Sequence, residues 1–359
     1  MPSTKPLLIQ VVPRIRPGRC GITDHGIALA HELQTEFGVS TAFVALGGCD
    51  PGDLTFPVFE STAAKLLDTC SSLNNGRAGT VLVHLSGYGY SPDGIPDRLA
   101  KALEQLRASG QFRIAVYCHE LFAVGPPWKS AFWYSHRQQK AVREIGTLCE
   151  LIVTNTSHHA NWLKRQLGKP SADSLKLLPV FSTVGEAHEP MPFDRRNQVM
   201  AVFGLPGTRR NAYAQLGALS EMLNSIGITQ FLDIGPSSEV PGEINGITVA
   251  RMGELSVADL ARMLSSCMYG FVHHPSFCLA KSSIFAGYCA QGVIPVVAEP
   301  FRGEIDGLTD GMHVISPTTA ATAKATGWAG CSKAAWNWYM AHSVRRHARQ
   351  YVEWISEAA

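Results

Sequence analysis

Short apolar runs alternate with amphipathic stretches along this chain, and they do so in two separate series. The first series begins with the apolar run Leu7–Val12 and continues to residues 151–155, with helical periodicity between the runs. The second series runs from residues 198–203 to residues 293–297. Strands separated by helices predict a parallel sheet covered on both faces, because parallel neighbours need a crossover connection. The sequence therefore predicts an α/β fold with two doubly wound, Rossmann-like domains.

The segment 181–196 separates the two series. It loses periodicity and gains proline, glycine and charge, which are features of a linker. A chain of 359 residues is also too long for one typical core. We therefore expect an N-terminal domain over 1–185 and a C-terminal domain over 196–334. The amphipathic end of the chain predicts one long helix, of which 335–359 packs back onto the N-terminal domain.

Composition restricts the environment and the partners of the chain. The net charge of +2 creates no overall field for nucleic acid or an anionic membrane, so we expect no nucleic-acid partner. No apolar segment approaches the roughly 20 residues that a membrane span needs. The nine cysteines form no CxxC pair and are typical of reduced, buried thiols. We expect a cytoplasmic protein, with peripheral contact at the inner face of a membrane left open.

The segment 270–297 (GFVHHPSFCLAKSSIFAGYCAQGVIPVV) predicts a strand, a polar loop, a helix and a second strand. Ser282 and Ser283 are suitable residues for the N-terminal cap of that helix. The first-turn N–H groups and the helix dipole favour an anion there, and Lys281 adds a positive charge. The segment therefore predicts a phosphate or diphosphate pocket. An ordinary strand-to-helix turn with a capped helix is the alternative.

A second basic site follows the first strand of the C-terminal series. The loop there reads GLPGTRR and leads into a helix that we expect over 211–226. Arg209 and Arg210 stand at the predicted helix start, where positive charge opposes the helix dipole. An anionic ligand would explain this placement. The alternative is that both side chains are exposed to solvent at the helix start and bind nothing.

The loop after the first strand, PGRCGITDHG over 17–26, is rich in glycine. Gly21 and its neighbours allow a ligand to approach the backbone, and Thr23 or Asp24 would cap the following helix. If this loop lines the ligand crevice, Asp24 or His25 could orient or deprotonate a hydroxyl of the ligand. A role for Asp24 as a helix cap alone is an equal alternative.

Several strands of the first series end on imidazole or small polar residues, including His84, His119 and Asn155. The carboxyl ends of parallel strands meet at the ligand crevice, so these side chains are expected to line one cleft. His119 stands beside Glu120, which could polarise it. The aromatic stretch that includes Trp128 predicts a loop that stacks on sugar rings, dips into a membrane interface or packs as a hydrophobic lid.

Three short segments resemble the glycosyltransferases of the GT-B fold, in particular the family 4 type. PGRCGITDHG resembles the loop that opens many of these enzymes, HHPSFCL resembles their PSxxEGFGL segment, and AQGVIPVV resembles their xxGxPVV segment. The resemblance implies two domains facing a cleft and a C-terminal crossover helix. It also implies that Arg209, Arg210, Lys281, Ser282 and Ser283 bind the diphosphate of a nucleotide sugar.

The chain departs from this family because the usual Glu-x7-Glu pair is missing. No acidic residue occurs between positions 274 and 298, where the resemblance would place contacts to the donor sugar and ribose. The resemblance still implies a retaining, metal-independent transferase for glycan or lipid-linked acceptors. It implies that no cofactor is needed. It also implies acid–base roles for Asp24 and His25, an acceptor contact for Gly21 and a sugar contact for His119.

Two other functions remain open at this point. One is an inactive nucleotide-binding or regulatory subunit of the same fold, which the missing glutamates would explain. The other is a sugar-nucleotide epimerase.

Overall fold

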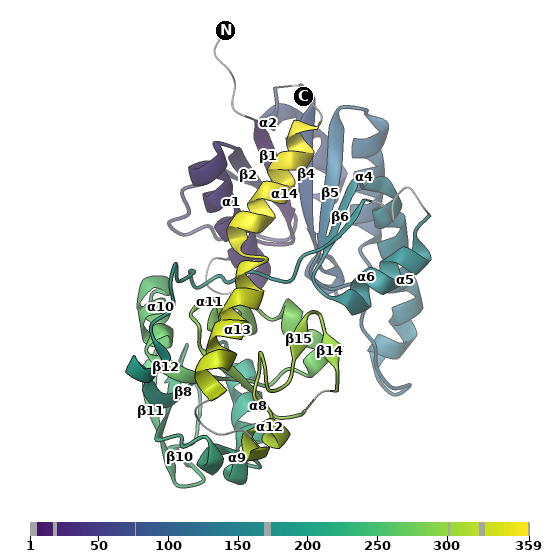
Figure 1. Cartoon of the computed structure of the whole chain (residues 1–359). Helices are drawn as coiled ribbons and strands as arrows, with labels where there is room; N and C mark the ends of the chain where they lie inside the picture. Colours follow the sequence, from purple (N-terminus) through teal and green to yellow (C-terminus); the bar gives the residue numbers. More distant parts are fainter. Residues whose placement is uncertain are drawn as a thin grey trace. The chain divides into compact units, whose positions relative to one another are not determined.

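The computed structural model of the chain describes residues 6–16, 20–75, 77–168, 174–300, 302–322 and 327–357. The chain divides into two compact units (Figure 1). Unit 1 comprises Met1–Leu178 together with Val344–Ala359, and unit 2 comprises Pro179–Ser343. Each unit has its own sheet, so the predicted α/β architecture with two Rossmann-like sheets is confirmed.

Unit 1 contains a seven-stranded sheet in which every pairing is parallel. Its order is β3-β2-β1-β4-β5-β6-β7, so the direction of strand addition reverses between β1 and β4. That reversal is the topological switch point, at which open α/β sheets bind their ligands. The strands are β1 (Leu7–Val12), β2 (Ser40–Ala45), β3 (Val58–Glu60), β4 (Gly79–Leu85), β5 (Phe112–Cys118), β6 (Leu151–Thr154) and β7 (Leu175–Leu177).

Helices connect these strands, and α14 (Val344–Ser356) returns from the end of the chain to pack against α1 (Figure 1). The guanidinium of Arg113 on β5 donates a hydrogen bond to the carbonyl of Trp354 on α14, which fastens this late helix to the sheet. The other helical elements are α1 (Gly21–Phe37), η1 (Ala63–Lys65), α2 (Leu66–Leu73), α3 (Gly87–Tyr90), α4 (Asp97–Ala108), α5 (Ser130–Leu148) and α6 (Ser157–Gln166).

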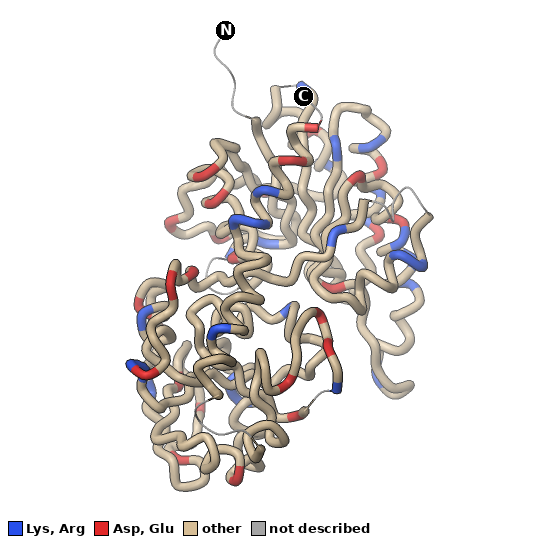
Figure 2. Tube along the Cα trace, viewed as in Figure 1, with Lys and Arg blue, Asp and Glu red and all other residues tan. Residues whose placement is uncertain are grey.

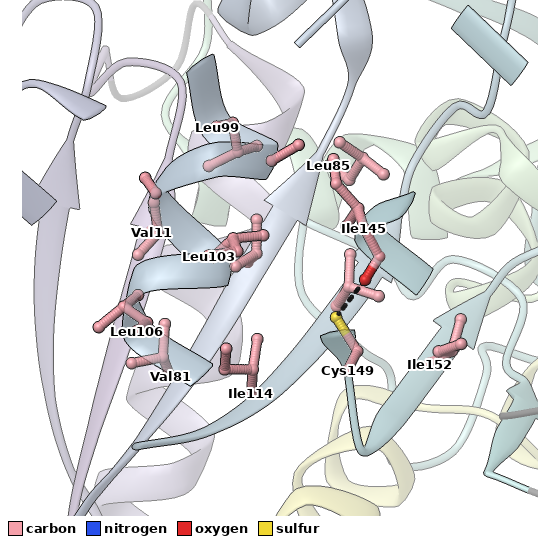
Figure 3. Packing of buried hydrophobic residues seen from close by; sticks show 14 of the residues in the cluster. Val11, Val81, Leu85, Leu99, Leu103, Leu106, Ile114, Ile145, Cys149 and Ile152 are labelled. Carbon is pink, nitrogen blue, oxygen red and sulfur yellow. Dashed lines mark hydrogen bonds between the residues drawn. The ribbon is translucent and has the colours of Figure 1, made fainter. Parts of the chain in front are cut away.

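The core of unit 1 forms where helices cover the apolar sheet faces. Leu99, Leu103 and Leu106 of α4 recur at helical spacing and lie beside Val81 and other buried strand residues (Figure 3). Central parallel strands are covered on both faces, so β1 is buried along nearly its whole length. A polar residue in such a strand requires a hydrogen-bond partner. Gln10 is the polar residue of β1, so its amide must be hydrogen-bonded.

Unit 2 contains a six-stranded sheet of order β10-β11-β9-β8-β12-β13. Its pairings are parallel except for the antiparallel β10–β11 pair, and its switch point lies between β8 and β12. A separate antiparallel pair consists of β14 (Glu304–Ile305) and β15 (Leu308–Thr309). The strands of the main sheet are β8 (Asn197–Phe203), β9 (Gln230–Ile234), β10 (Glu243–Ile244), β11 (Ile247–Gly253), β12 (Cys267–Val272) and β13 (Ile294–Val297).

The helical elements of unit 2 differ from the sequence expectation after β8. They are η2 (Phe193–Arg195), α8 (Pro206–Leu216), α9 (Ser220–Ser225), α10 (Val257–Ser265), η3 (Ser276–Lys281), α11 (Ser283–Ala290), α12 (Pro317–Thr322) and α13 (Trp328–Met340). The helix expected over 211–226 is two helices, of which the first begins at Pro206. Proline is favoured at the first helical position because its missing N–H is not needed there.

The single helix expected at the end of the chain is also two helices. α13 ends at Met340, and α14 begins at Val344 in the other unit. The aromatic stretch that includes Trp128 was expected to be a loop, but its residues 132–134 lie in the first two turns of α5, which begins at Ser130. Across the residues that the structure describes, no helix combines the length and the apolar character required to cross a membrane.

Candidate functional site

A continuous chain of polar side chains lies at the switch point of unit 1. Gln10 is buried in β1, and its amide Nε2 donates to the carbonyl oxygen of Gly26 in α1 at 3.2 Å. Its Oε1 lies 2.6 Å from Nε2 of His84, the penultimate residue of β4. Nδ1 of His84 lies 3.1 Å from Nε2 of His119, which follows β5. Three elements therefore bring a glutamine and two histidines into one hydrogen-bonded row.

The direction of these hydrogen bonds follows from the one unambiguous acceptor. The carbonyl of Gly26 can only accept, so the amide nitrogen of Gln10 faces it and the amide oxygen faces His84. A neutral His84 must then carry its proton on Nε2 and present a lone pair on Nδ1. His119 donates its Nε2 proton to that lone pair and keeps a second lone pair on its own Nδ1.

His25 of α1 completes the cluster, because its imidazole lies against both other rings. Its ring centroid is 5.7 Å from that of His84 and 4.9 Å from that of His119. Tyr117 and His347 also contact it, with centroid distances of 4.6 and 6.1 Å. One nitrogen from each of His25, His84 and His119 can be chosen so that all three lie within 4.8 Å of one another.

Burial keeps the three imidazoles of this histidine cluster neutral. Desolvation, with smaller contributions from His119, His84 and His347, holds the pKa of His25 well below its ordinary value. Desolvation lowers the pKa of His84 to about 3. Desolvation and the neighbouring His84 also hold the pKa of His119 well below its ordinary value. At neutral pH the cluster therefore offers lone pairs rather than positive charge.

The other predicted residues of unit 1 lie at the start of α1 and before α5. Residues 17–19 of the predicted loop lie outside the described part of the chain. Gly21 is the first residue of α1 and is exposed, and Asp24 is half-buried in its first turn. Trp128 is 81% exposed in the turn before α5, where the indole of nearby Trp133 donates to the carbonyl of Pro127.

The expected cap of α1 is wrong. The N-cap position is Cys20, which makes no side-chain cap hydrogen bond, because the helix begins two residues before Thr23. The hydroxyl of Thr23 instead donates to the carbonyl of Arg14 at 2.8 Å and accepts from the N–H of Arg16. These bonds tie the start of α1 to the chain that leaves β1, and this fixes where Asp24 and His25 lie.

The switch point of unit 2 carries the residues predicted to bind a diphosphate. β8 ends at Phe203 and turns into α8 through Gly204, whose φ of 136° favours glycine. A Cβ built on Gly204 would lie 3.0 Å from the side chain of Ile284 in α11. The loop before α8 therefore lies next to the start of α11, and both follow neighbouring strands of the sheet.

At the start of α11, Ser282 is the N-cap residue, as expected. Its hydroxyl accepts from the N–H of Phe285 at 3.2 Å and lies 3.2 Å from Nδ1 of His274. Ser283 is the first residue of the helix, and Lys281 is half-buried at the end of η3. Desolvation, with His273 and Lys281 nearby, lowers the pKa of His274 to about 4. This helix start therefore holds one lysine and a neutral histidine.

Arg209 and Arg210 point to different surroundings. Arg210 is exposed on the first part of α8. Arg209 is 1% exposed, and its guanidinium forms an ion pair with Asp233 of β9 at 2.6 Å. It also donates to the hydroxyl of Ser238 and the carbonyl of Pro236. Arg210 and Lys281 therefore offer more accessible positive charge for an anion than Arg209.

Sequence reasoning did not single out Gln10 or Asp233. Gln10 is the one polar residue in an otherwise apolar strand, and this interruption was the available signal, because a buried amide needs partners. Asp233 lies in β9 among hydrophobic residues, which likewise signals a buried partner. Neither signal identifies that partner, since His84 is 74 residues from Gln10 and Arg209 is 24 residues from Asp233.

Comparison with known proteins identifies the fold. No protein-family model and no curated protein matches the sequence. An alpha-glucosyltransferase in complex with UDP has a similar structure, with a TM-score of 0.62 and 11% identity over 98% of this chain and 100% of that chain. Anabaena HepE with UDP and glucose aligns with a TM-score of 0.61 and 11% identity over 98% of this chain and all of that one.

Two further similar structures broaden the range of activities. One is described as trehalose-6-phosphate from E. coli bound with UDP-2-fluoro glucose, with a TM-score of 0.59 and 10% identity over 97% of this chain and 98% of that chain. The other is a putative UDP-N-acetylglucosamine 2-epimerase from Listeria monocytogenes, at the same TM-score and 11% identity over 97% of this chain and 95% of that chain. A shared fold therefore does not fix the reaction.

The exclusion of nucleic acid as a partner is wrong. Structures of the alpha-glucosyltransferase with UDP-glucose or UDP also contain DNA, and they match this chain with TM-scores of 0.60 to 0.62. The net charge of +2 was therefore not a sound basis for the exclusion, since a total charge does not describe its distribution. Lysine and arginine residues lie on both units, interspersed with acidic residues (Figure 2).

Each of these solved structures matches the chain almost from end to end, so both sheets of the chain are included in the match. The predicted fold class is confirmed: the chain has the GT-B fold, with two Rossmann-like domains.

Proposed function

We propose that this protein transfers a sugar from a nucleoside-diphosphate sugar to a hydroxyl acceptor. The observation that carries the proposal is the position of the diphosphate candidates at the switch point of unit 2. Gly204, the start of α8 and the start of α11 all lie at the carboxyl edges of β8 and β12. Open α/β sheets bind nucleotides at this position, and UDP occurs in several structures of the same fold.

In this proposal the diphosphate lies against Arg210, Lys281 and the first turn of α11. Cationic side chains and helix N-terminal N–H groups stabilise the negative charge that develops on a leaving diphosphate. Ser282 fixes the helix start through its bond to the N–H of Phe285, and Ser283 begins the first turn. We assign Arg209 a supporting role, because its guanidinium already binds Asp233.

On the unit 1 side, we propose that the histidine cluster and Asp24 bind the acceptor and the transferred sugar. The tautomers set by Gln10 leave a lone pair on Nδ1 of half-buried His119, which suits a hydroxyl donor. Asp24 and His25, both in the first two turns of α1, are the candidates to orient or deprotonate the acceptor. Gly21 and Trp128 remain candidates for acceptor contacts.

The reaction is proposed to be retaining and independent of metal, as the resemblance to family 4 enzymes implies. The sugar is proposed to be a hexose and the acceptor a glycan or a lipid-linked molecule. The nine cysteines, all free in the structure, support a reducing compartment such as the cytoplasm.

Nucleotide binding provides the first test. UDP and GDP are added separately, and the rise in Tm is compared between wild type and the Arg210→Ala/Lys281→Ala variant. A ligand at one hundred times its Kd stabilises by about 2.7 kcal/mol, which is readily seen as a higher Tm. We expect the variant to lose this rise. Arg262→Ala is the matched control. Arg262 is exposed near the end of α10, which leads to the amino end of β12, whereas the proposed site lies at the carboxyl ends of the strands.

The absence of a Tm rise with any nucleoside diphosphate would contradict the proposal. Where binding occurs, turnover distinguishes the functions. Each donor is incubated with sugars, lipid-linked glycans and a 13-mer DNA containing an HMU base, the DNA used with the alpha-glucosyltransferase. NMR of the product then gives the anomer, and EDTA treatment tests metal independence.

Two alternatives predict different results in the same experiment. An inactive binding subunit would bind the nucleotide and give no product; the buried Arg209–Asp233 pair and the missing glutamates motivate this alternative. An epimerase would change the sugar without an acceptor, and the epimerase of the same fold motivates this alternative. A glycosylated acceptor with release of free nucleoside diphosphate supports the transferase.

A further inference from the structure

The histidine cluster has the composition of a metal site. His25, His84 and His119 come from α1, the end of β4 and the residue after β5, and their closest set of nitrogens lies within 4.8 Å. Within the described part of the chain, no other histidine, cysteine or carboxylate residues form a cluster of three with this geometry. Such convergence brings three neutral imidazoles, each a good ligand for divalent metals, to one point.

The separations are close to those of a bound ion. With Zn–N bonds of 2.0–2.1 Å in a tetrahedral site, ligand nitrogens lie roughly 3.3 Å apart. Nδ1 of His84 and Nε2 of His119 are 3.1 Å apart and therefore need almost no movement. The largest separation in the cluster, up to 4.8 Å, is about 1.5 Å too long, so His25 must turn toward the other two.

The surroundings of His84 match those of a metal-bound histidine. A ligating imidazole typically donates its other N–H to a carboxylate or carbonyl oxygen, which fixes the tautomer and the ring. Nε2 of His84 makes such a bond, at 2.6 Å, to Oε1 of Gln10, and Gln10 is itself held by Gly26. Nδ1 of His84 is therefore already oriented as a ligand atom. His119 can become a ligand by moving its proton from Nε2 to Nδ1.

We propose that His25, His84 and His119 bind one divalent ion such as Zn²⁺, and that Gln10 positions His84 for this role. His119 is half-buried whereas His25 and His84 are buried, and the fourth coordination position remains for water or an added ligand. The proposal goes beyond sugar transfer. An ion bound here would occupy the side chains proposed to bind the acceptor, so it would act as an inhibitor and not as a catalyst.

The test is direct metal binding to the full chain after treatment with EDTA. Zn²⁺ binding is measured by calorimetry, and Co²⁺ binding by visible absorption, which reports four-coordinate geometry. We expect one ion per chain, with tetrahedral Co²⁺ absorption. His119→Gln and His84→Gln should each abolish stoichiometric binding. Gln10→Met should weaken it by about 10- to 100-fold, as expected for the partner of a ligating histidine.

His158→Gln is the matched control, because His158 is an exposed histidine on α6 with a second histidine beside it. Its binding should equal that of wild type. Circular dichroism confirms that each variant folds, and the half-buried position of His119 makes His119→Gln the more tolerant of the two ligand variants. No stoichiometric uptake by wild type, or equal uptake by His119→Gln, would overturn the proposal. Neither result depends on sugar transfer.

Discussion

At the scale of single residues, the Arg209–Asp233 pair shows how a residue predicted to bind a ligand can act within the fold. The guanidinium and the carboxylate are both buried, and Tyr213 also donates to Asp233 at 3.0 Å. A buried ion pair offsets its desolvation only while both partners are present. Burial, with Asp233 nearby, also raises the pKa of Tyr213, which therefore remains a neutral donor.

Asp233→Asn should lower the free energy of unfolding by about 3–5 kcal/mol, because it leaves the Arg209 guanidinium buried without a counter-charge. Arg209→Met should have a similar effect by isolating the carboxylate. The double variant should cost much less than the sum of the two, since no buried charge remains and Asn can still accept from Tyr213. Urea unfolding of the four proteins measures this coupling. Additive single effects would show that the two side chains contribute to stability independently and not as an ion pair.

His274 provides a residue-scale prediction of pH dependence. Its pKa is about 4 in the folded protein and about 6.5 when unfolded, so the unfolded chain takes up the proton first as the pH falls. Stability from neutral His274 is complete above pH 6.5 and is lost between pH 6.5 and 4. The loss amounts to at most about 3 kcal/mol.

Urea unfolding of wild type and His274→Gln at pH 7, 5.5 and 4.5 measures this contribution. A glutamine amide can either donate to or accept from the Ser282 hydroxyl, so the variant should differ from wild type mainly in its pH dependence. The stability of wild type should fall more steeply below pH 6.5 than that of the variant. Parallel curves would mean that His274 does not titrate differently in the folded protein.

At the scale of elements, α1 depends on the absence of a side chain at Gly26. A Cβ there would lie 3.1 Å from Oε1 of Gln10, 3.1 Å from the ring of Phe43 and 3.5 Å from Nε2 of His84. Phe43 is fully buried, and Gln10 is hydrogen-bonded at both ends, so neither can move away easily. The helix can therefore approach β1 and β4 closely only with glycine at this position.

Gly26→Ala should consequently destabilise the protein, although alanine is favoured over glycine within a helix by about 0.5–1 kcal/mol. Gly330→Ala is the matched control, because Gly330 is an exposed helical glycine with no atom within 4 Å of an added Cβ. The control should gain a few tenths of a kcal/mol to about 1 kcal/mol. The Tm of both variants, measured by thermal unfolding, tests this prediction. A higher Tm for Gly26→Ala would show that α1 has room for a Cβ beside Gln10 and Phe43.

Element boundaries were predictable where local chemistry determines them. Ser282 caps α11 as expected, because a serine before an apolar helical run is a local signal. The start of α8 was missed although Pro206 was a usable signal for the first helical position. The short strands β3 and β10 were also missed, since two or three residues at a sheet edge carry too little periodicity.

At the scale of the whole molecule, the two-sheet architecture was predictable because strand–helix alternation is a local pattern that is repeated along the chain. That pattern does not predict the order of the strands within each sheet, and therefore it does not predict the switch points. The histidine cluster shows why the sites were harder to predict. His84 and His119 are separated by 35 residues, and His347 comes from α14, so only the folded chain brings them together.

The composition of unit 1 from two distant parts of the chain has a consequence for its synthesis. Arg113 binds the carbonyl of Trp354 across a separation of 241 residues, and His347, Ala348 and Tyr351 of α14 are completely buried. A ribosome releases the seven strands of unit 1 long before it makes this helix. During that interval the growing polypeptide exposes the apolar surface that α14 later covers. The folding of unit 1 can therefore be completed only after unit 2 has been translated.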